Sequence, residues 1–164
     1  ALTTGDQNVA VGTGALSTDD VGKFSTAIGY AALNAQNFAT ATTTYNVAVG
    51  HSAGLSVTTG TSNTLIGALA GDAITTGASN VAVGINSLGS NQAGANSIAI
   101  GNGALFTQVG SGNMFNIGIG ADAGYAVTTG TANTIIGGLA GDSLTDGTHN
   151  TFVGKEVTTA IKTA

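Results

Sequence analysis

The sequence predicts an all-β protein, a parallel β-solenoid of nine coils with about 17 residues in each coil. Three observations support this fold class. A short motif that ends in glycine recurs nine times at a nearly constant interval, its apolar residues alternate with a period of two, and glycine is too frequent for helices. We expect the coils to stack through parallel strands, with glycines near the corners.

The repeat has the form Asn/Ser-x-x-Val/Ile-Gly, with a third residue that is usually small. Its final residues, here called the marker glycines, are Gly12, Gly29, Gly50, Gly67, Gly84, Gly101, Gly120, Gly137 and Gly154. They lie 17 residues apart except for two intervals of 21 and 19. Seven coils carry another glycine seven positions before the marker, where a turn would need positive φ. Because nothing interrupts the register, residues 1–164 are expected to form a single repeat array.

The residues before each marker glycine predict a strand. Val or Ile always precedes the marker, and a β-branched residue stands two positions earlier, as in Thr64 and Ile66. This period of two places both columns on one face, which we expect to be the core, while small residues such as Ala48 form the opposite face. A helix is excluded because each interior glycine would cost about 1 kcal/mol.

A polar column opens each strand and predicts a hydrogen-bonded ladder. We expect stacked amides along it to bond to one another and to corner backbone groups, and we favour this structural role over a ligand site. The asparagines of the column are Asn8, Asn46, Asn63, Asn80, Asn116, Asn133 and Asn150, with Ser25 and Ser97 in the other two coils.

A longer period overlies the coils and divides them into two four-coil modules followed by a terminal coil. Residues 50–84 and 120–154 share 21 of 35 residues, which indicates duplication of about 70 residues. The long coils, residues 30–50 and 102–120, occupy the same place in each module and carry Phe38, Tyr45, Phe106, Met114 and Phe115. These side chains either contact a receptor, a glycan or a neighbouring fibre, or they fold back and plug the core or an oligomer interface.

Composition excludes several classes of function. Only 7% of residues are charged, Arg is absent and Lys occurs three times, which argues against nucleic-acid binding. No apolar run reaches the ~20 residues of a membrane span, and no targeting signal opens the chain. A mean hydropathy of +0.31 indicates that much outer surface is buried against other copies of the chain.

The sequence offers no catalytic centre. His51 and His149 are about six coils apart, and Asp72 and Asp142 are equivalents in separate modules, so neither pair can share a site. The GGLAGD segment lacks the spacing and tandem copies of a calcium repeat, and single hexapeptides that match acyltransferase β-helices do not continue round the coil. We therefore expect no enzyme activity, no cofactor and no metal.

Two stretches carry a family resemblance. The segment GASNVAVGINS at residues 77–87 resembles the head repeats of trimeric autotransporter adhesins, and TTGTSNTLIGALAG resembles arrays in phage tail fibres. The resemblance implies three parallel chains, each a left-handed β-roll, packed around a common axis through their small-residue faces. The adhesin repeats are shorter than 17 residues, and neither their membrane anchor nor their coiled-coil neck is present.

We therefore expect a structural or adhesive fibre protein, extracellular, on a cell surface or in a virion, whose partners are copies of itself and a receptor or glycan. One alternative is a single-chain solenoid that polymerises end to end, because coil-like sequence continues to both ends of the chain. Another is an ice- or surface-binding solenoid, because VTTGT at Val57 recurs at Val127 and places threonines at equivalent positions.

Overall fold

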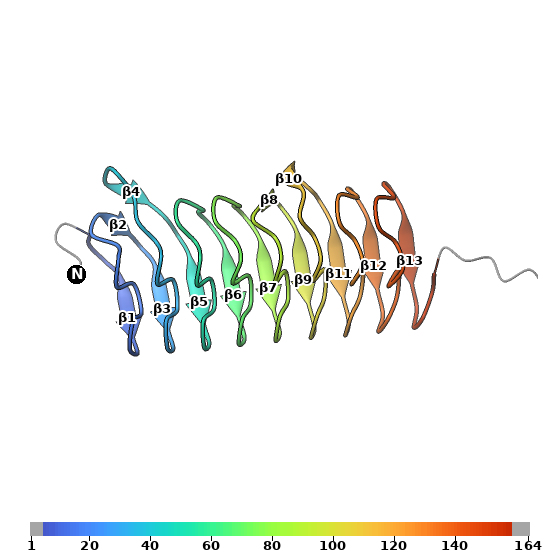
Figure 1. The fold of residues 1–164 in the computed structure, drawn as a ribbon, viewed down its shortest axis with the longest axis horizontal. Coiled ribbons are helices and arrows are strands. Elements are labelled where there is room, and N and C mark those ends of the chain that lie inside the picture. Colours follow the sequence, from blue (N-terminus) through green and yellow to red (C-terminus); the bar gives the residue numbers. More distant parts are fainter. Residues whose placement is uncertain (1–4, 159–164) are drawn as a thin grey trace, which may run out of the picture.

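The computed structural model describes residues 5–158 and shows a parallel β-solenoid of nine coils, with no helix in this part of the chain. The coils follow one another along a single axis in the order of the sequence (Figure 1). A search of the same residues for a helix able to cross a membrane finds none. The predicted all-β, nine-coil solenoid is confirmed.

One strand from each coil enters a nine-stranded sheet in which all neighbours are parallel. Each pair is in register: Thr64 lies opposite Val81, and Ile66 opposite Val83. The strands, in sheet order, are β1 (Val9–Val11), β3 (Thr26–Ile28), β5 (Val47–Val49), β6 (Thr64–Ile66), β7 (Val81–Val83), β9 (Ile98–Ile100), β11 (Ile117–Ile119), β12 (Thr134–Ile136) and β13 (Thr151–Val153).

The extra residues of the two long coils form small additional sheets. β4 (Thr42–Thr43) pairs with β2 (Gly22–Lys23) of the preceding coil, and β10 (Ser111–Asn113) pairs with β8 (Ala93–Ala95) in the same way. Figure 1 shows β4 and β10 raised above the line of the other coils on one side of the solenoid.

The strand faces are the reverse of the sequence prediction. The middle residue of the strand points into the coil, so that Ala48 and Leu65 are fully buried, whereas Ile66 is 40% exposed. The reason is the polar column: Asn63 lies two residues before Leu65 and therefore shares its face, and the fully buried Asn63 amide fixes that face inward. The small-residue face consequently lies inside each chain and cannot pack three chains together.

The four-coil module reflects complementary volumes in the core. Where a large side chain from a neighbouring position fills the centre of the coil, glycine stands four residues after the marker. A Cβ on Gly71, for example, would lie 2.7 Å from Leu65 and 2.8 Å from Ile74. In other coils this position is a buried leucine, such as Leu88 or Leu105. The narrow interior holds one arrangement or the other at close-packed density.

The marker glycines are required by both conformation and space. Gly67 has a φ of +133°, which side chains rarely adopt, and a Cβ there would lie 2.6 Å from the carbonyl oxygen of Gly84 in the next coil. The glycines seven positions earlier do not have the expected positive φ. At Gly77 the requirement is close approach, because a Cβ would lie 2.6 Å from the Gly94 oxygen.

Candidate functional site

The ladder asparagines bond from each coil to the next along the solenoid. Nδ2 of Asn63 donates to the Gly77 carbonyl of the next coil over 2.9 Å, and its Oδ1 accepts from the backbone N–H of Asn80 over 3.0 Å. The same inter-coil pattern starts at Asn8, Asn46, Asn80, Asn116 and Asn133. Both polar ends of each of these amides are occupied within the fold, so the column has a structural role.

Two buried glutamines complete the ladder where serine interrupts it. In the second module the Gln108 side-chain amide is hydrogen-bonded to the Ser97 hydroxyl. Asn116 donates to Oε1 of Gln108 over 2.9 Å. Gln36 has the corresponding place beside Ser25 and Asn46, and it also donates to the buried Asp19 over 2.6 Å. Sequence reasoning missed these glutamines, although each stands 11 residues after a ladder serine.

The structure separates the five side chains proposed from the long coils. Phe38 and Met114 are only 8% and 1% exposed, as a plug requires. Tyr45 and Phe115 are 59% and 56% exposed and lie two residues before β5 and β11. Phe106 is half-buried. The long coils therefore contribute both internal packing and exposed aromatic surface, and they do not bring these residues into one cluster.

Aromatic rings from adjacent coils stack at three places. Phe24 stacks on Tyr45 with ring centroids 5.5 Å apart, and Tyr30 stacks on His51 at 5.2 Å. Phe106 stacks on Tyr125 at 5.3 Å with an angle of 15° between the ring planes. The sequence analysis did not identify Phe24, Tyr30 or Tyr125, although each lies one coil away from its partner at the equivalent position.

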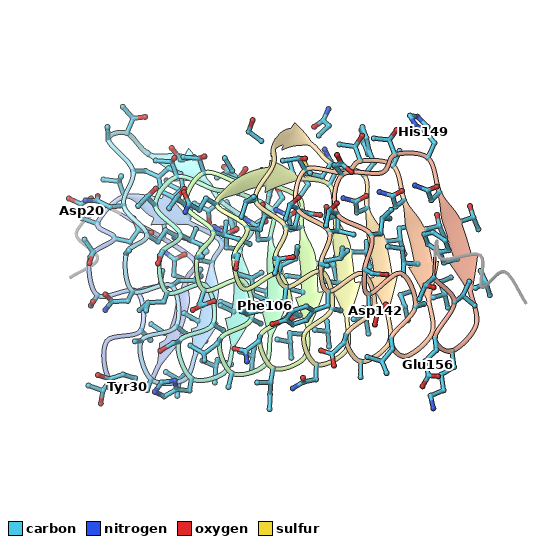
Figure 2. All side chains as sticks on the ribbon, turned by 45° about the vertical axis from the view of Figure 1, so that its right-hand side comes forward. Asp20, Tyr30, Phe106, Asp142, His149 and Glu156 are labelled. Carbon is cyan, nitrogen blue, oxygen red and sulfur yellow. The ribbon has the colours of Figure 1, made fainter. Side chains whose placement is uncertain are left out.

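A shallow hollow of about 230 Å³ lies beside the Phe106–Tyr125 stack. Its lining residues are Asp122, Tyr125, Leu139 and Asp142, which come from two adjacent coils. Tyr125 and Leu139 are 40% and 37% exposed. Figure 2 shows Phe106 and Asp142 at the same level of the coils, as expected for residues five positions after their marker glycines.

The rings and one carboxylate of this region lean towards the N-terminal coils. A Cβ on Gly89 would lie 2.7 Å from the Phe106 ring, and one on Gly103 would collide with Oδ1 of Asp122. The ring of Phe106 therefore rests on Gly89, and the Asp122 carboxylate lies over Gly103. This inclination covers one face of the Tyr125 ring with Phe106 and leaves space on the side of Leu139 and Asp142.

The outer surface of the nine-stranded sheet, here called the outward face, is exposed along its whole length. The first and third residues of every strand point outwards, and these 18 positions are 14 Val or Ile and four Thr. Exposure is 38% at Ile28, 40% at Ile66 and 38% at Ile100. The face thus presents uncharged, β-branched side chains in register from β1 to β13.

Within residues 5–158, no three His, Cys, Asp or Glu side chains are grouped to hold a metal ion. His51 stacks on Tyr30 and His149 is exposed near the last coil. Desolvation by burial raises the pKa of Asp72 above its usual value, although hydrogen bonds from the Asp72 and Ala73 backbone oppose the shift.

The first threonine of each pair in the segments suggested for ice binding donates its hydroxyl within the fold. Thr58 and Thr128 donate their hydroxyls to the Thr75 and Thr145 carbonyls of the next coil, both over 3.1 Å. Thr75 donates to Gln92 O in the same way, and the column then passes through Gln92 itself.

Comparison with protein-family models, with curated proteins and with solved structures finds no match to this chain.

Proposed function

We propose that the protein is a structural and adhesive fibre component that assembles side by side through its outward face into a homotrimer, in an extracellular or virion setting. The observation that carries this proposal is the composition of that face, in which every strand position is β-branched and none is charged. A sheet that faces water on one side normally carries polar residues there.

The dimensions of the face suit an interface. Eight inter-strand spacings of about 4.8 Å give a length of about 38 Å, and three residues give a width of about 10 Å. The projected area of the face is about 400 Å², which is already the size of a large apolar patch on a monomeric protein. The side-chain surfaces and the flanking residues add to this area. A stable complex buries roughly 800 Å² on each partner, so residues that flank the sheet would have to contribute to the interface as well.

The repeat resemblance supports three chains over two. The resemblance implies three parallel solenoids packed around one axis. Three copies of the flat outward face can meet at such an axis without burying any charged group. The packing surface in this proposal is the β-branched face, in place of the small-residue face expected from the sequence. The exposed rings of Tyr45 and Phe115 lie next to it, two residues before their strands, where a neighbouring chain or a receptor could contact them.

Sedimentation equilibrium of the purified chain tests the assembly. We expect a trimer that dissociates when Val81→Lys and Ile98→Lys are combined on the central strands, because each lysine would bury a charge in the interface. Thr76→Lys, an exposed position outside the sheet, is the matched control and should leave the trimer intact.

Other states would contradict the proposal in distinct ways. A monodisperse monomer would exclude both fibre models, and thermal hysteresis of that monomer would indicate ice binding by the flat face. Unlimited polymers that persist in the double lysine variant would instead support end-to-end stacking of single chains.

A further inference from the structure

We propose that the hollow beside Tyr125 is a binding subsite for a saccharide ring that carries no acidic group. The exposed side of the Tyr125 ring supplies the flat apolar surface on which the C–H face of a pyranose packs. Its other side is supported by Phe106, with the ring centroids 5.3 Å apart, so the platform is held before the ligand arrives. Preorganisation of this kind reduces the ordering cost of binding.

The two carboxylates of the hollow provide the polar half of the site. Asp122 and Asp142 are half-buried and line the hollow on adjacent coils. In the part of the chain that the structure describes, neither forms an ion pair, because Lys23 pairs with Asp6 and Lys155 with Glu156. Ionised carboxylates are strong acceptors, so they can each accept hydrogen bonds from sugar hydroxyls or from an amino group.

The charge of the hollow selects among saccharides. It holds two carboxylates and no basic side chain. A neutral hexose satisfies these acceptors with its hydroxyls, and an amino sugar adds a favourable charge. A uronic acid would place a third carboxylate beside them, and like-charge repulsion excludes it.

The first module has the equivalent turns but lacks two of the four side chains that line the hollow. The positions equivalent to Asp122 and Tyr125 are Ser52 and Leu55, while Leu69 and Asp72 match Leu139 and Asp142. Asn34 stands where the second module has Phe106. Ser52 and Asp122 have φ values of +55° and +54°, so the backbone is the same and only the ring platform and the second carboxylate differ.

The site lies on turn positions two and five residues after the marker glycines and outside the outward face. It therefore does not depend on assembly into a trimer, and binding can be measured whatever the oligomeric state. The natural differences between the modules supply substitutions that this scaffold already accommodates, Asp122→Ser and Tyr125→Leu. Tyr30→Leu removes another exposed ring, which is 58% exposed and far from the hollow, and serves as the matched control.

The experiment is saturation-transfer NMR on the full chain in the presence of EDTA. The probes are cellotriose, galactotriose, a glucosamine trimer and a galacturonate trimer, each near the dissociation constant on the order of 1 mM that a small open site would give. We expect transfer to ring protons of at least one of the first three probes, roughly tenfold weaker binding in each hollow variant, and unchanged binding in the control.

Several results would overturn the inference. They are no transfer to any of the three non-acidic probes, equal binding of the galacturonate trimer, or wild-type binding in both hollow variants. Displacement by trilysine at lower concentration than by any saccharide would assign the hollow to a basic peptide. Circular dichroism and thermal melting of each variant establish that a loss of binding is not a loss of fold.

Discussion

Asn116 donates a hydrogen bond from Nδ2 to Oε1 of Gln108 over 2.9 Å, at the level of the stack where Ser97 replaces a ladder asparagine. The Ser97 hydroxyl bonds to Gln108 instead of to a backbone carbonyl as a ladder asparagine does, and the chain of the long coil is rerouted through β10 just before Asn116. The glutamine restores acceptors and donors inside the stack. Loop insertion, serine and glutamine thus form one structural unit, which recurs at Ser25, Gln36 and Asn46.

The first prediction concerns this unit. Gln108→Val, which copies Val127 from the equivalent position of the next coil, should lower the free energy of unfolding by about 2 kcal/mol, because Ser97 and Asn116 each lose a buried partner. Adding Ser97→Ala should cost less than the sum of the single changes, because both members of one hydrogen bond are then removed. Urea denaturation of the wild type, the two single variants and the double variant measures this coupling. If the two losses of stability were strictly additive, Ser97 and Gln108 would not interact.

The second prediction distinguishes two kinds of glycine. Gly67→Ala should destabilise the protein by more than about 4 kcal/mol, because its φ of +133° and the Gly84 carbonyl both oppose a Cβ. Gly138→Ala should be neutral or stabilise by about 0.5 kcal/mol, because its nearest neighbour would be Ala121 O at 3.8 Å. Thermal melting compares the two, and equal effects would mean that glycine acts only through chain entropy.

The third prediction separates plug from surface contact in the long coils. Phe38→Ala should reduce stability by about 3 kcal/mol, because the ring is almost fully buried. Phe115→Ala should change stability by no more than about 0.5 kcal/mol, because the ring is 56% exposed. Under the proposed adhesive function, binding to a receptor should fall only in the second variant. Loss of adhesion in a folded Phe38→Ala protein would place the contact at the first long coil instead.

The fourth prediction follows from the desolvated carboxyl of Asp72. Because its pKa is raised in the folded state, its ionisation opposes folding, and this cost appears as pH rises above the unfolded value of 3.8. Asp72→Asn should therefore raise stability near neutral pH by up to about 0.5 kcal/mol and have no such effect near pH 3. Melting curves at both pH values test this, and a gain confined to the acidic condition would reverse the sign of the argument.

Much of the architecture could be predicted from local pattern. The glycine register gives the number of coils, the positions of the long coils and the strand before each marker, and all nine strands end one residue before a marker glycine, as Ile66 does before Gly67. The stacks of Phe106 on Tyr125 and of Tyr30 on His51 could also have been found by aligning equivalent positions. The hollow could not, because it depends on which way the Tyr125 and Asp122 side chains lean.

By itself, the sequence determined the repeat, the period-two alternation and the small volume available within each coil. Only the tertiary structure decided which strand face is inside. Alternation is symmetric, so Leu65 and Ile66 are equally good candidates for burial until Asn63 is placed, and a buried amide needs backbone partners that only the next coil supplies. That choice turned the β-branched columns outwards and made them an exposed, uncharged surface.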